Sequence, residues 1–365
     1  MGGTAYLTAD PRHLLNVPAG RMSALPDQPD DFAEWLRGRA AGTDFVPRSW
    51  YGAYLRDHLD RRDVRHLEDE AVSAGPDGVT TASGERLAAD DVVLALGNRA
   101  PARDWVPAGL DVLDPWQPLD VDGDVLLVGT GLTAVDLALS LARPGRTVHL
   151  VSRHGWLPQR HAPSTPVPGP DLAGVRGLTA LVNTVLTHLQ GDWRAGLDSL
   201  RPITQQLWAS LDPTEKHQFV EHYGRLWDVH RHRMPPATAE ALEQHLGTGA
   251  VEVSAATVVG PGVELSGGRR LSVDAVVNCT GSDPDLRRSP TPLTQQLFRD
   301  GLVQPGPLGW GLGSDQDGRV GEHLWTLGPL RRGSLWETTA IPEIRCQARD
   351  LATAVLGDRA LSLAV

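Results

Sequence analysis

The sequence predicts an α/β protein built on a strand, glycine turn, helix and strand unit, and three observations lead to this prediction. The stretch VLLVGTGLTAVDLAL, residues 125–139, combines an apolar run, a glycine turn and an apolar helical pattern. A second apolar run, TVHLVSR, follows as the next strand. Residues 171 to about 247 show helical spacing without a strand signal, which predicts an inserted helical subdomain.

Composition limits the classes of partner. A chain of 365 residues is long enough for two domains, and 41% hydrophobic residues can form ordinary cores. The 45 acidic and 34 basic side chains give a net charge of -11, which disfavours nucleic acid and anionic membranes as partners. Small molecules are therefore the expected partners.

Cysteine content indicates the redox environment. Cys279 and Cys346 are the only cysteines and form no C-x-x-C pair, which fits a reducing compartment and argues against a disulfide reductase mechanism. The start MGGTAYLTAD has no basic region followed by an apolar run, and no stretch of about 18 uninterrupted apolar residues occurs. We therefore expect a cytoplasmic location.

The remaining elements follow from local patterns in chain order. Prolines break residues 1 to about 60 until DFAEWLRGRA and WYGAYLRDHLDR show helical spacing. VRHLEDEAVS, GVTTAS and ERLAADDVVLALG predict a small meander that closes with a buried strand at 92–96. HAPSTPVPGP is a predicted loop, AVEVSAATVVGP and AVVNCTG are predicted strands, and a final helix is predicted from about Pro342.

The glycine turn at 129–134 has the pattern of a dinucleotide-binding turn. Gly129 permits the tight turn, Gly131 lets the backbone approach a pyrophosphate, and the small Ala134 allows close packing of the helix on its strand. The helix N-terminus offers free N–H groups to phosphate oxygens. The alternative is a purely structural turn. The predicted cofactor contacts here are Gly129, Thr130, Gly131, Leu132 and Thr133.

The end of the second strand indicates which nicotinamide cofactor is bound. Ser152 and Arg153 stand there, roughly 20 residues after the turn, where an NAD-binding unit places an acid for the ribose hydroxyls. Arginine instead favours a 2′-phosphate, so we predict NADPH, with Arg153 binding the phosphate and Ser152 beside it. The alternative is a surface arginine at a strand end.

Several stretches together resemble one family. LLNVPAGRMSALPDQPDDF, FVPRSWYGAYLRDHL, DDVVLALGNRAP, WDVHRHRMPP, DAVVNCTG and LWETTAIPEIR occur in an order similar to that of class B flavin-dependent monooxygenases, in the branch with urate hydroxylase-like and aspartate N-monooxygenase-like proteins. The resemblance implies two interleaved, Rossmann-like dinucleotide-binding domains of the glutathione-reductase type. Residues 1–120 and 276–365 would form the FAD domain, and 121–275 the NADP(H) domain with the helical insert.

The resemblance also implies individual roles. Asn16 would line the flavin ring as the catalytic amide, although an Asn in LLNVP is equally typical of a turn. Contacts to the substrate are expected from two segments, although a structural histidine and a solvated basic face are the alternatives. The candidates there are His13, Arg21, His230 and Arg231. Further cofactor contacts are expected at Gly97, Thr280, Gly281, Gly328, Thr338 and Thr339, the last two of which could equally cap the final helix. No metal site is predicted.

One family feature does not occur in this sequence. Family members begin with a strand, G-x-G-x-x-G turn and helix that hold the ADP half of FAD, whereas here Met1-Gly2-Gly3 stands after that unit. We expect either a start that is internal to a longer reading frame or a truncated paralogue. In either case this sequence lacks the turn that holds the ADP half of FAD in the family, so tight flavin binding by this chain is not expected.

These patterns lead to one preferred function. The predicted function is an NADPH-dependent flavin monooxygenase that hydroxylates a small polar molecule. The alternatives are a flavoprotein reductase without oxygen insertion and a non-catalytic or flavin-deficient NADP-binding paralogue.

Overall fold

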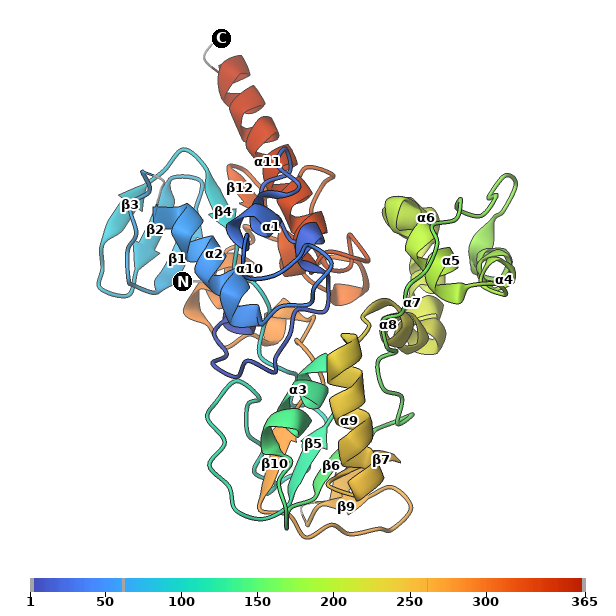
Figure 1. Ribbon diagram of the computed structural model, residues 1–365. Helices are drawn as coiled ribbons and strands as arrows, with labels where there is room; N and C mark the ends of the chain where they lie inside the picture. Colours follow the sequence, from blue (N-terminus) through green and yellow to red (C-terminus); the bar gives the residue numbers. More distant parts are fainter. Residues whose placement is uncertain (1–2, 61–62, 261, 363–365) are drawn as a thin grey trace.

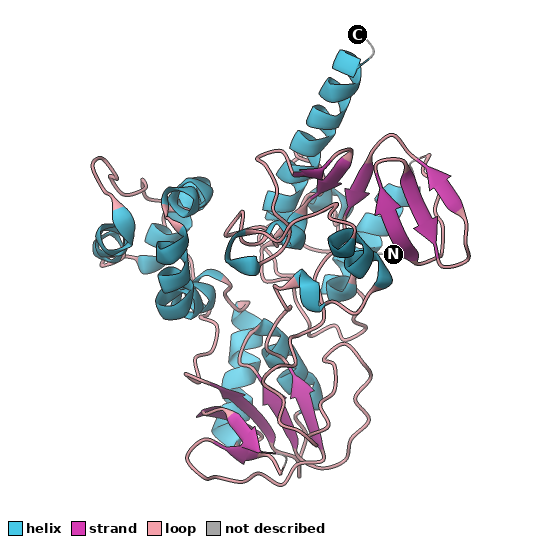
Figure 2. Cartoon of the chain, turned by 180° about the vertical axis from the view of Figure 1, so that it is seen from behind, coloured by secondary structure: helices cyan, strands magenta, loops and turns pink. Residues whose placement is uncertain are grey.

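The computed structural model describes residues 3–60, 63–260 and 262–362. They form two halves that each contain β-sheet, together with a helical region that stands to one side (Figure 1). Seen from behind, the strands form separate groups in the two halves (Figure 2). Because the chain passes from one half to the other and back, the two halves are interleaved as the resemblance implied.

One half is built on a four-stranded parallel sheet in the order β10-β5-β6-β7. The strands are β5 (Val125–Val128), β6 (Val148–Ser152), β7 (Val251–Ala255) and β10 (Ala275–Asn278). Every residue of β5 and β10 is buried, as expected for a parallel sheet covered on both faces. Helices α3 (Leu132–Leu141) and α9 (Pro236–Thr248) share the core of this sheet.

The other half joins the first and last parts of the chain. Strand β4 (Val92–Leu94) pairs in parallel with β12 (Leu324–Thr326), and β11 (Arg319–Gly321) pairs antiparallel to β12. Beside them lies a three-stranded meander of β1 (Ala71–Gly75), β2 (Gly78–Thr81) and β3 (Arg86–Ala88). The strand predicted to close this meander, β4, instead belongs to the sheet of β12 and β11. The helices are α1 (Asp31–Trp35), α2 (Arg48–Asp60), α10 (Pro292–Arg299) and α11 (Ile341–Ser362).

The helical insert consists of α4 (Gly177–His188), α5 (Trp193–Ser199), α6 (Thr204–Ser210), α7 (Pro213–Phe219) and α8 (Arg225–Arg231). A π-helical stretch, Val220–Gly224, joins α7 to α8. The last helix of the predicted insert, α9, packs on the parallel sheet instead, because Ala239 and Leu242 lie in its core (Figure 1). Strands β8 (Val258–Gly260) and β9 (Glu264–Leu265) form a small pair after β7.

Two predicted elements are shorter than the sequence suggested. The first helix ends at Trp35, shortly before Gly38, whose φ of 80° is incompatible with a continuing α-helix. The strand predicted at 92–96 ends at Leu94, shortly before Gly97 turns the chain with a φ of 67°. Among the described residues, no helix combines the length and apolar character needed to cross a bilayer.

Candidate functional site

The two glycines of the turn after β5 have different surroundings. Gly129 has a φ of 125°, and a Cβ built on it would lie 2.2 Å from the carbonyl oxygen of Cys279 at the end of β10. Gly131 has a φ of -81°, and a Cβ built there meets nothing within 4 Å. The first glycine is therefore required by the packing of the sheet, whereas the second leaves space beside the N-terminus of α3. That space suits a close-approaching phosphate.

Thr130, between these glycines, contacts the end of β6, the loop that follows β6, and the start of α8. Its hydroxyl donates to the carbonyl oxygen of Trp156 at 2.7 Å and lies 2.9 Å from the Ser152 hydroxyl at the end of β6. Arg225, the first residue of α8, donates from Nη2 to the same Trp156 carbonyl at 2.7 Å and to Thr130 Oγ1 at 3.0 Å. Burial lowers the pKa of the Arg225 guanidinium. Sequence reasoning missed Arg225 because it lies 95 residues from the turn.

Arg153 lies at the carboxyl end of β6, and its charge is not paired with a described residue. It is exposed, and its guanidinium makes no hydrogen bond or ion pair with any residue in the described ranges. Close by in sequence, the rings of His154 and Trp156 stack with centroids 4.5 Å apart, and Trp156 is 41% exposed. The edge of the sheet thus offers a cation and an aromatic surface next to the turn.

The two passages of the chain between the halves run side by side. The Arg99 amide donates to Ser282 Oγ at 2.7 Å, and the Asp283 amide donates to the Ala100 carbonyl oxygen at 3.1 Å. These contacts place the segment that begins at Gly97 beside the one that follows β10. Three predicted cofactor residues, Gly97, Thr280 and Gly281, therefore occupy this crossing, and Thr280 follows Cys279, which contacts Gly129.

The carboxyl end of β12 is closed by its own hydrogen bonds. The Gly328 amide donates to Gln347 Oε1 at 2.8 Å, and the Thr338 hydroxyl donates to the Gly328 carbonyl oxygen at 2.7 Å. Gln347 Nε2 donates to Thr338 Oγ1 at 2.9 Å, and Thr338 is only 1% exposed. Of the predicted residues in this region, Thr339 is exposed shortly before α11 begins.

Asn16 lies where the two halves approach each other. It is half-buried, and its carbonyl oxygen accepts a hydrogen bond from His161 Nε2 at 3.0 Å. The His161 ring also contacts Phe45, with centroids 4.9 Å apart, and burial lowers the pKa of His161. The backbone at Asn16 is thus held to the loop that leads from the parallel sheet to the helical insert.

His13 connects the N-terminal segment to α3. Its Nε2 lies 2.8 Å from Ser140 Oγ and 3.1 Å from the Asp136 carbonyl oxygen. Next to it, Arg48 Nη2 lies 2.7 Å from the buried carboxylate of Asp136. These contacts join the two halves behind the glycine turn. Arg21, by contrast, is exposed at the end of a short helical turn, Ala19–Arg21.

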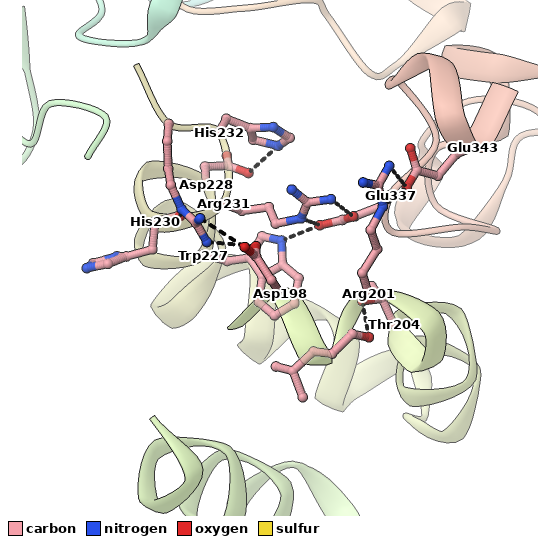
Figure 3. Close-up of polar contacts among 12 residues, drawn as sticks. Asp198, Arg201, Thr204, Trp227, Asp228, His230, Arg231, His232, Glu337 and Glu343 are labelled. Atoms are coloured by element: carbon pink, nitrogen blue, oxygen red, sulfur yellow. Dashed lines mark hydrogen bonds and ion pairs between the residues drawn. The ribbon is translucent and has the colours of Figure 1, made fainter. Parts of the chain in front are cut away.

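Arg231 and His230 lie at the end of α8, and the Arg231 side chain faces the segment before α11 (Figure 3). Arg231 contacts both carboxylate oxygens of Glu337, at 2.8 and 3.1 Å, and the two side chains are 14% and 10% exposed. The indole nitrogen of Trp227 adds a third hydrogen bond to Glu337 at 3.1 Å. The Arg231 charge is therefore paired with a carboxylate in this structure.

His230 points away from that ion pair. Its Nδ1 donates to the carbonyl oxygen of Leu226 in the same helix, and its ring lies edge-on to Trp193. It also lines an open cavity of about 570 Å³ between α9 and the segment 155–160.

Comparisons with known proteins bear on the fold. Residues 1–99 match a protein-family model described as FAD-NAD(P)-binding. The ornithine N-hydroxylase of Kutzneria sp. 744 superimposes with a TM-score of 0.57 at 15% identity, over 98% of this chain and 90% of the hydroxylase. The cadaverine monooxygenase of Erwinia amylovora gives 0.60 at 13% identity, over 98% and 86% of the two chains.

A third similar structure is the L-lysine 6-monooxygenase of Pseudomonas syringae, with a TM-score of 0.52 at 19% identity over 92% of this chain and 81% of that enzyme. This chain shares the two-domain α/β fold of these three enzymes. The predicted fold class is thereby confirmed. A comparison with curated protein sequences gives no match.

Proposed function

We propose that the protein is an NADPH- and FAD-dependent oxidoreductase that hydroxylates a small polar molecule. One observation supports the choice of NADPH above all others: the open Gly131 position stands at the same sheet edge as the unpaired guanidinium of Arg153. Arginine is suited to a 2′-phosphate, and free N–H groups at the start of α3 are suited to the diphosphate. The residues present therefore fit NADPH.

The chain's own residues would perform distinct tasks in this proposal. Gly131 and the first turn of α3 hold the diphosphate, and Arg153 selects the phosphorylated ribose. Asn16 would line the flavin, and Gly97, Thr280, Gly281 and Thr339 would contact the cofactors. FAD supplies the oxygen chemistry when bound, and the protein contributes orientation and exclusion of water.

The substrate class is proposed from the size and polarity of the molecules on which similar folds act. The three enzymes compared above are named for ornithine, cadaverine and lysine, all small amines. The helical insert is the proposed source of selectivity, because α8 borders both the glycine turn and the segment before α11. Both cysteines are unpaired, which fits the proposed cytoplasmic location.

The test compares cofactor binding and turnover in the full chain. We expect NADPH to bind more tightly than NADH, and Arg153→Glu to weaken NADPH binding at least about tenfold because it brings a carboxylate to the 2′-phosphate. Arg143→Glu, on an exposed arginine of the same half, is the matched control. Added FAD and candidate amines should then give a hydroxylated product.

The rival functions give different results in the same experiment. NADPH oxidation that a candidate amine stimulates without hydroxylated product would identify a reductase. A colourless protein that binds NADPH but takes up no added FAD would identify a non-catalytic NADP-binding protein.

A further inference from the structure

Arg225 brings a positive charge from the helical insert into the glycine turn without a carboxylate to neutralise it. Its three hydrogen bonds, all from Nη2, go to the carbonyl oxygens of Thr130 and Trp156 and to the Thr130 hydroxyl. Within the described ranges no ion pair involves Arg225, although Asp228 is close enough to raise its pKa slightly. A cation held only by neutral groups is available to an anion.

The partial burial of Arg225 makes an arriving anion more favourable. Arg225 is half-buried, and burial lowers its pKa, as expected for a charge with incomplete access to water. A guanidinium in such a place gains more from a phosphate than an exposed one does, because hydrogen bonds between charged partners strengthen as water is excluded. The other arginines of α8 and its end differ, since Arg231 pairs with Glu337 and Arg233 with Asp198.

Arg225 also has hydrogen-bond donors that no described residue accepts. Its Nη1 and Nε atoms have no hydrogen-bond partner among the described residues, and neither atom is among the fully buried unpaired ones. Because guanidinium groups donate in a planar fork, these atoms are able to reach a ligand while Nη2 stays bound to Thr130. The same contact to Thr130 places the guanidinium at the turn, beside the open position of Gly131.

We infer that Arg225 is a diphosphate-binding residue, so that the helical insert supplies part of the dinucleotide site. This inference rests on the proposed NADPH site and assigns two different phosphate groups of the cofactor to two arginines. Arg225 acts at the turn, on the diphosphate that NADPH and NADH share. Arg153 acts at the end of β6, on the 2′-phosphate that NADPH alone carries.

The different roles inferred for Arg225 and Arg153 can be tested directly with the purified full chain. Tryptophan-to-nicotinamide energy transfer measures Kd for NADPH and NADH in the wild type, Arg225→Gln, Arg153→Gln and the control Arg143→Gln. We expect Arg225→Gln to weaken both cofactors about 10- to 100-fold with the NADPH/NADH ratio unchanged, the effect of one lost charge-assisted hydrogen-bonding group. Arg153→Gln should weaken NADPH and leave NADH nearly unaffected.

A second measurement separates binding from a purely structural link between α8 and the turn. Inorganic pyrophosphate should raise the melting temperature of the wild type and of Arg153→Gln, and this increase should be absent in Arg225→Gln. A structural link alone would lower the melting temperature of the unliganded variant and leave the pyrophosphate effect in place, which would overturn the inference.

Two outcomes distinguish this inference from the proposed function. Wild-type protein that binds NADPH while Arg225→Gln binds it equally well would refute the role of Arg225 and leave the proposed function standing. Wild-type protein that binds neither cofactor would refute both.

Discussion

Two pairs of parallel strands, β5 with β6 and β4 with β12, have similar glycine turns at their carboxyl ends. The groups around these turns differ in whether other parts of the chain bind them. Both pairs are followed by glycines with positive φ, at Gly129 in one and at Gly97 and Gly328 in the other. At the β5–β6 end, Gly131 is open and Arg153 has no hydrogen-bond or ion-pair partner in the part of the chain that the structure describes. At the β12 end, Gly328, Thr338 and Gln347 satisfy one another's hydrogen bonds.

This difference shows that a strand-end glycine does not by itself make a binding site. Parallel strands direct backbone groups toward the same edge, and whether those groups meet a ligand depends on what else fills the edge. At the β12 end, the Thr338 and Gln347 side chains bind the backbone groups of Gly328. At the β5–β6 end the described residues do not fill the space at Gly131 or pair with Arg153, and there we propose a ligand. The predictions below test this contrast.

The largest expected effect separates the two glycines of the turn. Gly129→Ala should destabilise folding by more than about 4 kcal/mol, because its methyl group would collide with the Cys279 carbonyl at a φ unsuited to alanine. Gly131→Ala should fold nearly as well as the wild type and bind NADPH more weakly, since its methyl group would enter open space. Urea unfolding and NADPH titration measure the two effects. Equal stability of the two variants would contradict the assignment.

The next effect concerns the contact that holds α3 behind the turn. Arg48→Met should destabilise the protein by about 3 kcal/mol, because it leaves the buried Asp136 carboxylate without its partner. Arg48→Met combined with Asp136→Leu should recover much of this loss, since no buried charge remains. Urea unfolding of the three proteins checks this. A double variant as unstable as the single one would show that packing, not charge, dominates.

A smaller effect probes the closed end at β12. Thr338→Val should cost about 1–3 kcal/mol, because the Gly328 carbonyl oxygen and Gln347 Nε2 each lose a partner in a buried setting. NADPH affinity should stay unchanged, in contrast to Gly131→Ala. Thermal unfolding and NADPH titration are the measurements. Loss of flavin affinity at unchanged stability would instead show that the Thr338 hydroxyl serves a ligand.

The smallest effect concerns His161, which binds the Asn16 carbonyl oxygen between the halves. Burial lowers its pKa in the folded protein, so the unfolded chain takes up the proton first as pH falls below about 6.5. Stability should therefore fall between pH 7 and pH 5, by less than about 1 kcal/mol because the ring is partly solvated. Arg231 and Arg233 nearby oppose the protonated form, and Asp198 favours it.

His161→Gln keeps a side-chain N–H donor but does not titrate. Melting temperatures across this pH range should fall less steeply for the variant than for the wild type. Parallel pH profiles would show that His161 does not contribute to the dependence.

Much of the fold could be predicted because its signals are local. The apolar runs of β5, β6 and β10, the turn at Gly129 and the start of α11 near Pro342 all follow from residues close together in the chain. Strand burial on both faces requires continuous apolar residues, and a tight turn requires glycine. The resemblance supplied the pairing of the two halves, which such local patterns do not contain.

The tertiary structure decided which of these local features remain free to bind. The resemblance implied ligand contacts at Arg231 and Thr338, and the folded chain pairs Arg231 with Glu337 and places Thr338 beside Gln347. Arg225 gave no signal, because its place at the turn depends on contacts across 95 residues. A side chain's chemistry is fixed by its type, whereas its availability depends on which groups the folded chain brings against it.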